Sequence, residues 1–171
     1  MKKELTRRSF LKLAGAGALA VAMSGSLTGC DVIDNLKDMD SVSAAIGDVK
    51  FMLSASVWVN NGSNGMSYQP TCEIRNNSKK AVTYGGSGSN CEVIITGVLT
   101  DKNGKEYPMT YAGKNGSAPA GEKYEVKDFK LVAVGKGLYM EGCKVVTTFT
   151  YQGKKAVFTD YDGGDFTSKV E

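Results

Sequence analysis

The chemistry open to this sequence is restricted most by a missing residue type, because its 171 residues include no histidine. Without histidine there is no Ser-His-Asp or Cys-His nucleophile, and no histidine-based zinc or copper site. The four cysteines show no Cys-x-x-Cys spacing, which argues against redox motifs, zinc ribbons, haem attachment and cysteine-bound clusters. A paired-carboxylate hydrolase stays open in principle. We therefore expect a protein that is not an enzyme, with no catalytic residue and no cofactor.

Two groups of residues could still bind a ligand. "DYDGGD" (160–165) places Asp160, Asp162 and Asp165 beside two glycines, which are hard oxygen ligands of the kind Ca²⁺ prefers. The spacing is not that of an EF-hand, so a solvated acidic tail is the simpler interpretation and no metal site is predicted.

The second group is aromatic. Trp58 falls on the polar side of an alternating strand, and several tyrosines lie in or beside predicted loops: Tyr68, Tyr84, Tyr107 and Tyr111. Exposed aromatic rings stack on sugars or anchor protein partners, although Trp and Tyr also suit half-buried strand surfaces. Trp58 is the candidate ligand contact that the sequence offers.

The N-terminal segment has the composition of an export signal. A basic head of five Lys and Arg residues precedes an apolar run of fifteen residues, 13–27, which is shorter than the roughly 20 that a membrane-spanning helix needs. Within the head, "TRRSFLK" (6–12) resembles the twin-arginine translocation signal through Arg7, Arg8, Phe10 and Leu11. The resemblance implies export, because such signals are addresses and not anchors.

A cysteine follows the apolar run. Leu27-Thr28-Gly29-Cys30 resembles the lipobox of bacterial lipoproteins. The resemblance implies that residues 1–29 are removed and that Cys30 then carries a thioether-linked diacylglycerol. Two or three acyl chains give stable anchoring, so the chain is predicted to be held on the extracytoplasmic side of the cell membrane, with membrane lipid as a partner.

The charge is distributed unevenly along the chain. The net charge of +3 includes +4 from residues 1–29, so the remainder carries −1 and gives no argument for nucleic acid. Residues 31–48 hold five Asp and one Lys, residues 49–155 carry +6, and residues 156–171 carry −3. We interpret residues 30–48 as the lipidated Cys with an acidic linker, and residues 49–171 as one domain.

From Val49 onward the hydrophobic period is two, which indicates strands. In the first of them the apolar side is Val49, Phe51, Leu53, Ala55, Val57 and Val59. "CEVIITGVLT" (91–100) is predicted at the sheet centre, Asn103-Gly104 at a hairpin turn, Pro108 on an edge strand, and 143–161 as a closing hairpin. About seven short strands without an amphipathic helix predict an all-β sandwich.

Three stretches carry a resemblance to a known type of domain. "CEIRNNSKKAV", "VIITGVLTDKNGKEY" and "APAGEKYEV", all within residues 68–127, are similar to the small immunoglobulin-like domains of bacterial lipoproteins, including the FxLYD type. The resemblance implies an immunoglobulin-like sandwich and leaves the function open, because this fold carries many roles.

In the strand order of such a domain, Cys72 and Cys143 lie near the starts of strands that face each other across the core. The resemblance therefore implies a Cys72–Cys143 disulfide, in a compartment that permits one. A Cys72–Cys91 bridge and three free thiols remain as alternatives.

Together these features predict a lipid-anchored, non-enzymatic module that binds or stabilises an envelope protein or polymer. Two alternatives stay open. One is a module that binds carbohydrate or wall polymer through its aromatic residues, and the other is an accessory subunit of a redox complex that is exported by the twin-arginine pathway.

Overall fold

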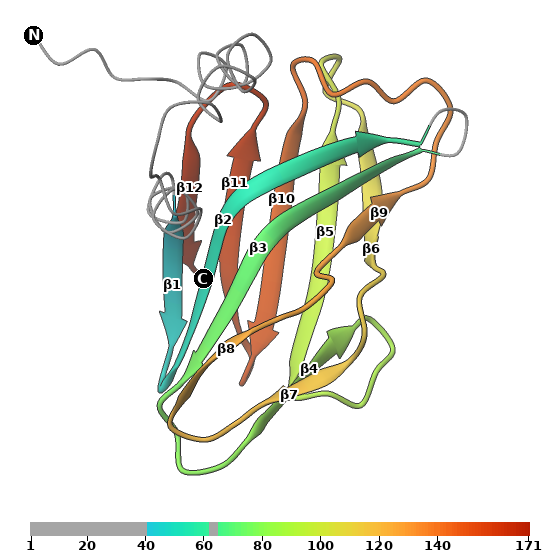
Figure 1. The fold of residues 1–171 in the computed structure, drawn as a ribbon. Helices are drawn as coiled ribbons and strands as arrows, with labels where there is room; N and C mark the ends of the chain where they lie inside the picture. Colours follow the sequence, from blue (N-terminus) through green and yellow to red (C-terminus); the bar gives the residue numbers. More distant parts are fainter. Residues whose placement is uncertain (1–40, 62–64) are drawn as a thin grey trace, which may run out of the picture. The chain divides into compact units, whose positions relative to one another are not determined.

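The computed structural model describes residues 41–61 and 65–171, and these residues form twelve β-strands and no helix. Figure 1 shows the strands, labelled and coloured by their position in the sequence. Their bounds are β1 Val42–Ile46, β2 Val49–Asn60, β3 Met66–Asn76, β4 Val82–Gly86, β5 Val93–Thr100, β6 Glu106–Tyr111, β7 Gly116–Ala118, β8 Glu122–Glu125, β9 Leu131–Ala133, β10 Lys144–Tyr151, β11 Lys154–Tyr161 and β12 Phe166–Val170.

The strands form one continuous sheet that curls into a nearly closed barrel. The main path is β1-β2-β3-β9-β6-β5-β10-β11-β12, with β4, β7 and β8 attached at its sides. The path has nine strands that are all antiparallel to their neighbours, so β1 and β12 run in the same direction where the ends of the sheet meet (Figure 1). A side-chain contact joins them there, because Ser168 Oγ donates to Ser43 O at 2.9 Å.

Aromatic rings fill the inside of the barrel. Phe149 of β10 stacks on Phe51 of β2, with 4.8 Å between the ring centroids, and packs edge-on against Phe158 of β11 at 5.5 Å. Phe129, which precedes β9, lies 6.0 Å from Phe149. All four rings are buried, so the centre of the barrel is a packed core.

A β-bulge divides β2 into two parts. Ser54 pairs with Thr71 and Val57 pairs with Gln69, so two residues of β2 lie opposite the single residue Pro70. An extra residue shifts the alternation by one position, and each later side chain then changes face. Val57 is accordingly 58% exposed, while Trp58 turns inward and packs against the core. The predicted alternation of this strand is correct for Val49, Phe51 and Leu53 and wrong beyond the bulge.

Asn76 explains why the Asn-Asn-Ser stretch ends β3. Its side chain is fully buried, and its Nδ2 donates to the carbonyl oxygens of Lys80 at 2.8 Å and Ala118 at 3.0 Å. Its Oδ1 accepts from the backbone and the hydroxyl of Ser78. A buried amide must satisfy its hydrogen bonds, and here they join the β3–β4 turn to β7.

The all-β class is confirmed, but the seven-strand sandwich is wrong, because a single twelve-stranded sheet curls upon itself. The local turn motifs that resemble immunoglobulin-like domains do not fix how sheets close. Strand β1 lies inside the range 30–48 that the sequence assigned to a linker. Five residues with modest hydrophobicity gave no clear strand signal there, and pairing with β2 supplies the hydrogen bonds that hold them.

The centre and the hairpins agree with the sequence predictions. Strand β5 lies between β6 and β10, and Gly104 in the β5–β6 turn has a φ of +81°, as a tight hairpin requires. The hairpin of β10 and β11 is also present. The prediction of an edge strand at Pro108 is wrong, since β6 lies between β5 and β9. Pro108 is tolerated because β9 pairs only with Met109–Tyr111, beyond the proline.

The described residues contain no helical segment with the length and apolarity that crossing a bilayer would require.

The aromatic core should dominate the stability of the domain. Phe149→Ala removes the ring that the other three contact, and we expect it to lower the free energy of unfolding by about 3–5 kcal/mol in urea titrations followed by fluorescence. Val134→Ala, at a side chain 80% exposed, is the control and should change it by less than about 0.5 kcal/mol. Equal effects of the two changes would contradict this assignment of the core.

Candidate binding site at the Trp58 end of the barrel

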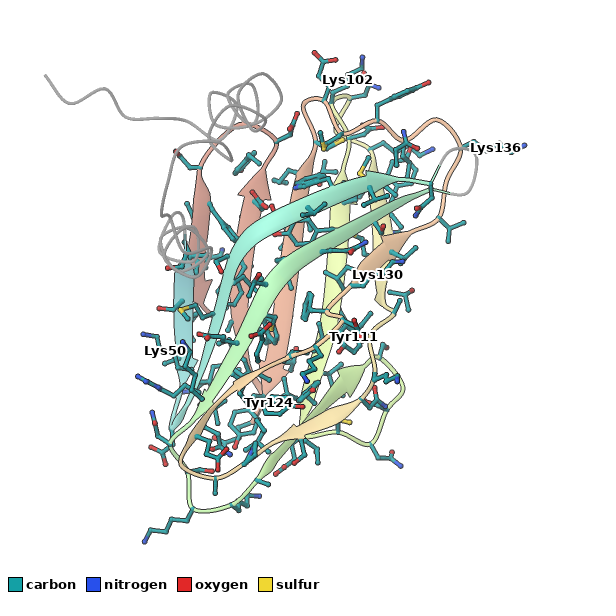
Figure 2. The ribbon with its side chains drawn as sticks, viewed as in Figure 1. Lys50, Lys102, Tyr111, Tyr124, Lys130 and Lys136 are labelled. Carbon is teal, nitrogen blue, oxygen red and sulfur yellow. The ribbon has the colours of Figure 1, made fainter. Side chains whose placement is uncertain are left out.

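A hollow of about 340 Å³ lies at one end of the barrel. Its volume is at the lower end of the range usual for small-ligand sites, roughly 300–1,000 Å³. Figure 2 shows Lys102, one of its residues, at this end, and Lys50 near the other. The hollow is lined by Trp58, Asn60, Met66, Lys102, Tyr139, Met140 and Glu141.

The connection between β9 and β10, residues 134–143, supplies the exposed side of the hollow. Leu138 in its middle is buried, and Asn60 Nδ2 donates to the Leu138 carbonyl at 3.1 Å. The Cys143 thiol donates to the carbonyl of Tyr139 at 2.7 Å. These two hydrogen bonds hold the backbone of the connection at Leu138 and Tyr139. The side chains of Tyr139 and Met140 remain 69% and 42% exposed.

Trp58 also lines the hollow and is held by a polar network. Its indole Nε1 donates to Ser56 Oγ at 3.2 Å, and its ring packs edge-on against Tyr68 at 5.3 Å. Ser56 Oγ and Tyr68 OH both donate to Asp160 Oδ2, at 2.6 and 2.9 Å. Ser56 and Tyr68 thus hold the indole directly, and Asp160 holds both of them in place.

The polar residues of the hollow complement the rings. Lys102 and Glu141 carry opposite charges, and both are exposed. Aromatic and thioether side chains can stack on a flat apolar surface, while an amide, an ammonium and a carboxylate can hydrogen-bond to hydroxyl groups. The arrangement is suited to binding a polar ligand that has an apolar face.

The structure separates the tyrosines that the sequence grouped together. Tyr68, Tyr84 and Tyr111 are buried in the core and Tyr107 is half-buried, so none of them joins Trp58 in the hollow. Burial raises the pKa of Tyr111 to about 12. The aromatic residue that does join is Tyr139, which sequence analysis missed. The nearby Gly135, Gly137 and Gly142 are typical of a loop, but nothing in the sequence indicates that this segment reaches Trp58.

The three aspartates of "DYDGGD" do not come together. Asp160 is buried and accepts from Ser56 and Tyr68, whereas Asp162 accepts from the backbone N–H of Gly142 at 3.2 Å. Among the described residues there is no group of three His, Cys, Asp or Glu side chains that could hold a metal ion.

The Cys72–Cys143 disulfide is absent, because Cys72, Cys91 and Cys143 are all free thiols. Strands β3 and β10 run in the same direction, and Tyr68 of β3 reaches Asp160, which pairs with Val145 of β10. Cys72 lies four residues after Tyr68, while Cys143 lies two residues before Val145. At about 3.3 Å per residue the cysteines are roughly 20 Å apart along the strands, well beyond the reach of a disulfide.

Burial changes the acidity of two thiols. It raises the pKa of Cys72 well above the usual value, and the charge of Glu73 adds to this effect. The pKa of Cys143 is also raised, first by burial and then by the nearby Asp101 and Asp162. A raised thiol pKa lowers the fraction of reactive thiolate at neutral pH.

The predicted export and lipidation residues lie outside the described residues: Arg7, Arg8, Phe10, Leu11, Leu27, Thr28, Gly29 and Cys30. Comparison with protein families matches residues 4–24 to the TAT (twin-arginine translocation) pathway signal sequence. The predicted signal is therefore confirmed, and it directs export across the cytoplasmic membrane. Neither the curated proteins nor the solved structures include a match to the chain.

The thiols should differ in reactivity. In the native protein at pH 8, we expect iodoacetamide to modify the half-exposed Cys91 at least about tenfold faster than Cys72 or Cys143, because burial shields those two and reduces their thiolate. Peptide mass spectrometry over time measures the three rates. In guanidinium without reductant all three should react fully, and a Cys72–Cys143 peptide that resists modification would contradict the free thiols.

Proposed function

We propose that the chain is a lipoprotein, held by acylated Cys30 on the extracytoplasmic side of the cell membrane, and that its barrel-like domain works by binding. One observation carries the proposal. The confirmed twin-arginine signal at residues 4–24 is followed, after two residues, by Leu27-Thr28-Gly29-Cys30, which has the order of a lipobox. A signal that only exports does not need a cysteine at this point, whereas acylation requires one.

The spacing between Cys30 and the domain is consistent with a tether. Residues 31–41 separate Cys30 from β1, which begins at Val42, and an extended chain of that length reaches at most about 40 Å. Four of these residues are aspartates. Acidic residues near a membrane surface are repelled by anionic lipids, which favours a domain held away from the bilayer.

The hollow at Trp58 supports binding and suggests the class of ligand. Tyr139 and Trp58 supply aromatic surface, and Asn60, Lys102 and Glu141 supply donors and acceptors beside it. A sugar ring has an apolar face for stacking and hydroxyl groups around its edge, so it matches both sets. We propose an envelope carbohydrate as the ligand. A protein partner that inserts an apolar side chain is the second candidate, because Tyr139 and Met140 are exposed large hydrophobic residues.

The lipid anchor can be tested at residue 30. In the native host, the mature N-terminal peptide should begin at Cys30 and carry the mass of a diacylglycerol, and labelled palmitate should enter the protein. Cys30→Ala should abolish incorporation of the label, whereas the matched control Cys91→Ala should retain it. Recovery of the wild-type chain as a soluble protein, or with an unmodified Cys30, would refute the anchor.

The carbohydrate ligand can be tested with a glycan array and calorimetry. Tyr139→Ala should weaken binding of a glycan found on the array by about tenfold or more, since a stacked aromatic ring contributes about 1–3 kcal/mol in comparable contacts. Tyr139 is the better test site because Trp58→Ala would also disturb Tyr68 and Ser56. Tyr161→Ala, at an exposed tyrosine outside the hollow, is the control. Equal loss in both variants, or no glycan bound, would contradict the proposal.

A further inference from the structure

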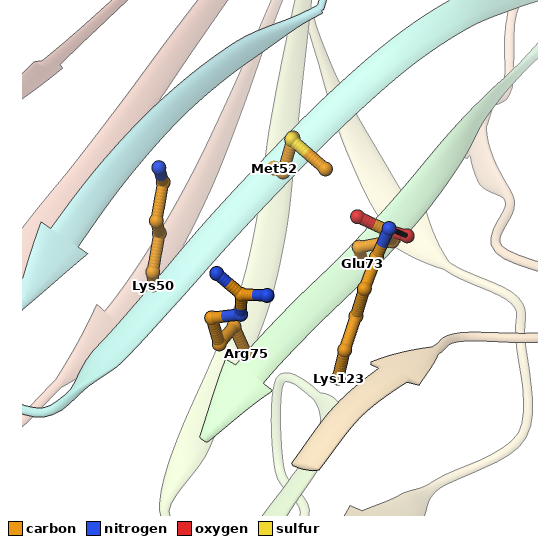
Figure 3. Close-up of a pocket in the computed structure, with 5 residues that line it drawn as sticks. All are labelled: Lys50, Met52, Glu73, Arg75 and Lys123. Carbon is orange, nitrogen blue, oxygen red and sulfur yellow. Dashed lines mark ion pairs between the residues drawn. The ribbon is translucent and has the colours of Figure 1, made fainter. Parts of the chain in front are cut away.

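Three cations lie side by side on the outer face of the sheet, far from the hollow at Trp58. Lys50 of β2 pairs with Arg75 of β3, and Arg75 pairs with Lys123 of β8. Directly opposed like charges destabilise a sheet. Figure 3 shows the Arg75 guanidinium between the side chains of Lys50 and Lys123. A row of this kind has an electrostatic cost that a bound anion would remove.

The charges of the row are only partly neutralised. Lys123 forms an ion pair with Glu73 (Figure 3). Glu73 lies two residues before Arg75 on β3, so its side chain is on the same face of the sheet. Lys50 and Arg75 form no ion pair with any residue that the structure describes. A second acid, Glu125, lies opposite Glu73 but does not line the hollow between these side chains.

The hollow between them has the size of a small ionic group. It has a volume of about 120 Å³ and is lined by Lys50, Met52, Glu73, Arg75 and Lys123. A guanidinium presents a planar fork of donors that matches a phosphate or carboxylate edge, and two ammonium groups beside it add charge without fixing geometry.

Glu73 restricts which kind of anion can bind in this hollow. Its Oε2 faces Lys123, but its Oε1 is buried and accepts no hydrogen bond within the part of the chain that the structure describes. A buried acceptor without a donor is unfavourable. The fitting ligand is therefore an anion that also carries an O–H donor, which hydrogen phosphate and glycerol phosphates possess and sulfate lacks.

We infer that Lys50, Arg75 and Lys123 with Glu73 form a binding site for a phosphate group that carries a hydroxyl donor. The site shares no residue with the proposed anchor or with the hollow at Trp58, so it does not depend on the proposed function.

Calorimetry at constant ionic strength tests the site on the full protein purified in neutral detergent. Inorganic phosphate should bind at least about tenfold more tightly than sulfate, a difference of about 1.4 kcal/mol. Arg75→Gln should weaken phosphate binding by about tenfold or more, and Glu73→Gln should remove the preference over sulfate. Lys154→Gln, a change of equal charge on β11, should leave both affinities unchanged.

Glycerophosphoglycerol, the soluble headgroup of phosphatidylglycerol, distinguishes the two sources of phosphate. Tighter binding than inorganic phosphate assigns a lipid headgroup to the site, and weaker binding assigns a free phosphate. No heat with any probe at about 10 mM, equal binding of sulfate, or unchanged binding by Arg75→Gln would overturn the inference.

Thermal unfolding at low salt provides an independent readout. Arg75→Gln should be at least as stable as the wild type, because it relieves repulsion within the row. A lower melting temperature would show that Arg75 has a structural role and would overturn the interpretation of the row as a ligand site.

Discussion

The packing of Phe149 against Phe51, Phe129 and Phe158 is the contact on which the rest of the structure depends. These four rings come from β2, from the segment before β9 and from the β10–β11 hairpin, and these three parts lie far apart in the chain. Burying these rings removes a large apolar area from water and brings together strands from opposite sides of the barrel. The sheet therefore curls around the rings. Its first and last strands, β1 and β12, come into contact, although they run in the same direction and do not pair as an antiparallel ladder.

The hollow at Trp58 follows from this closure together with one local irregularity. The bulge opposite Pro70 changes which face of β2 is buried, and so it turns Trp58 towards the core and leaves Val57 outside. The curl of the sheet then brings the β9–β10 connection to the same end, where Asn60 and Cys143 hold its backbone. Tyr139 and Trp58, which are 81 residues apart in the chain, line the same site because of these two effects.

The proposed roles use different parts of the chain. In our proposal, acylated Cys30 is the membrane anchor, the hollow at Trp58 offers aromatic surface with polar groups, and the row of Lys50, Arg75 and Lys123 offers charge. Three of the fourteen Lys and Arg side chains of residues 49–155 thus lie side by side on the outer face of β2, β3 and β8, and their mutual repulsion has an electrostatic cost.

The sequence by itself determined the export signal, the all-β class, the central position of β5 and the two hairpins. These features depend on local patterns: paired arginines, a period of two, and Gly104 at a turn that needs positive φ. Tertiary structure alone decided that the sheet forms a barrel, that β1 joins it, that the cysteines stay apart, and that Tyr139 meets Trp58. Each of these depends on contacts between residues far apart in the chain, and a one-residue bulge was enough to reverse the faces of a strand that the local pattern had assigned.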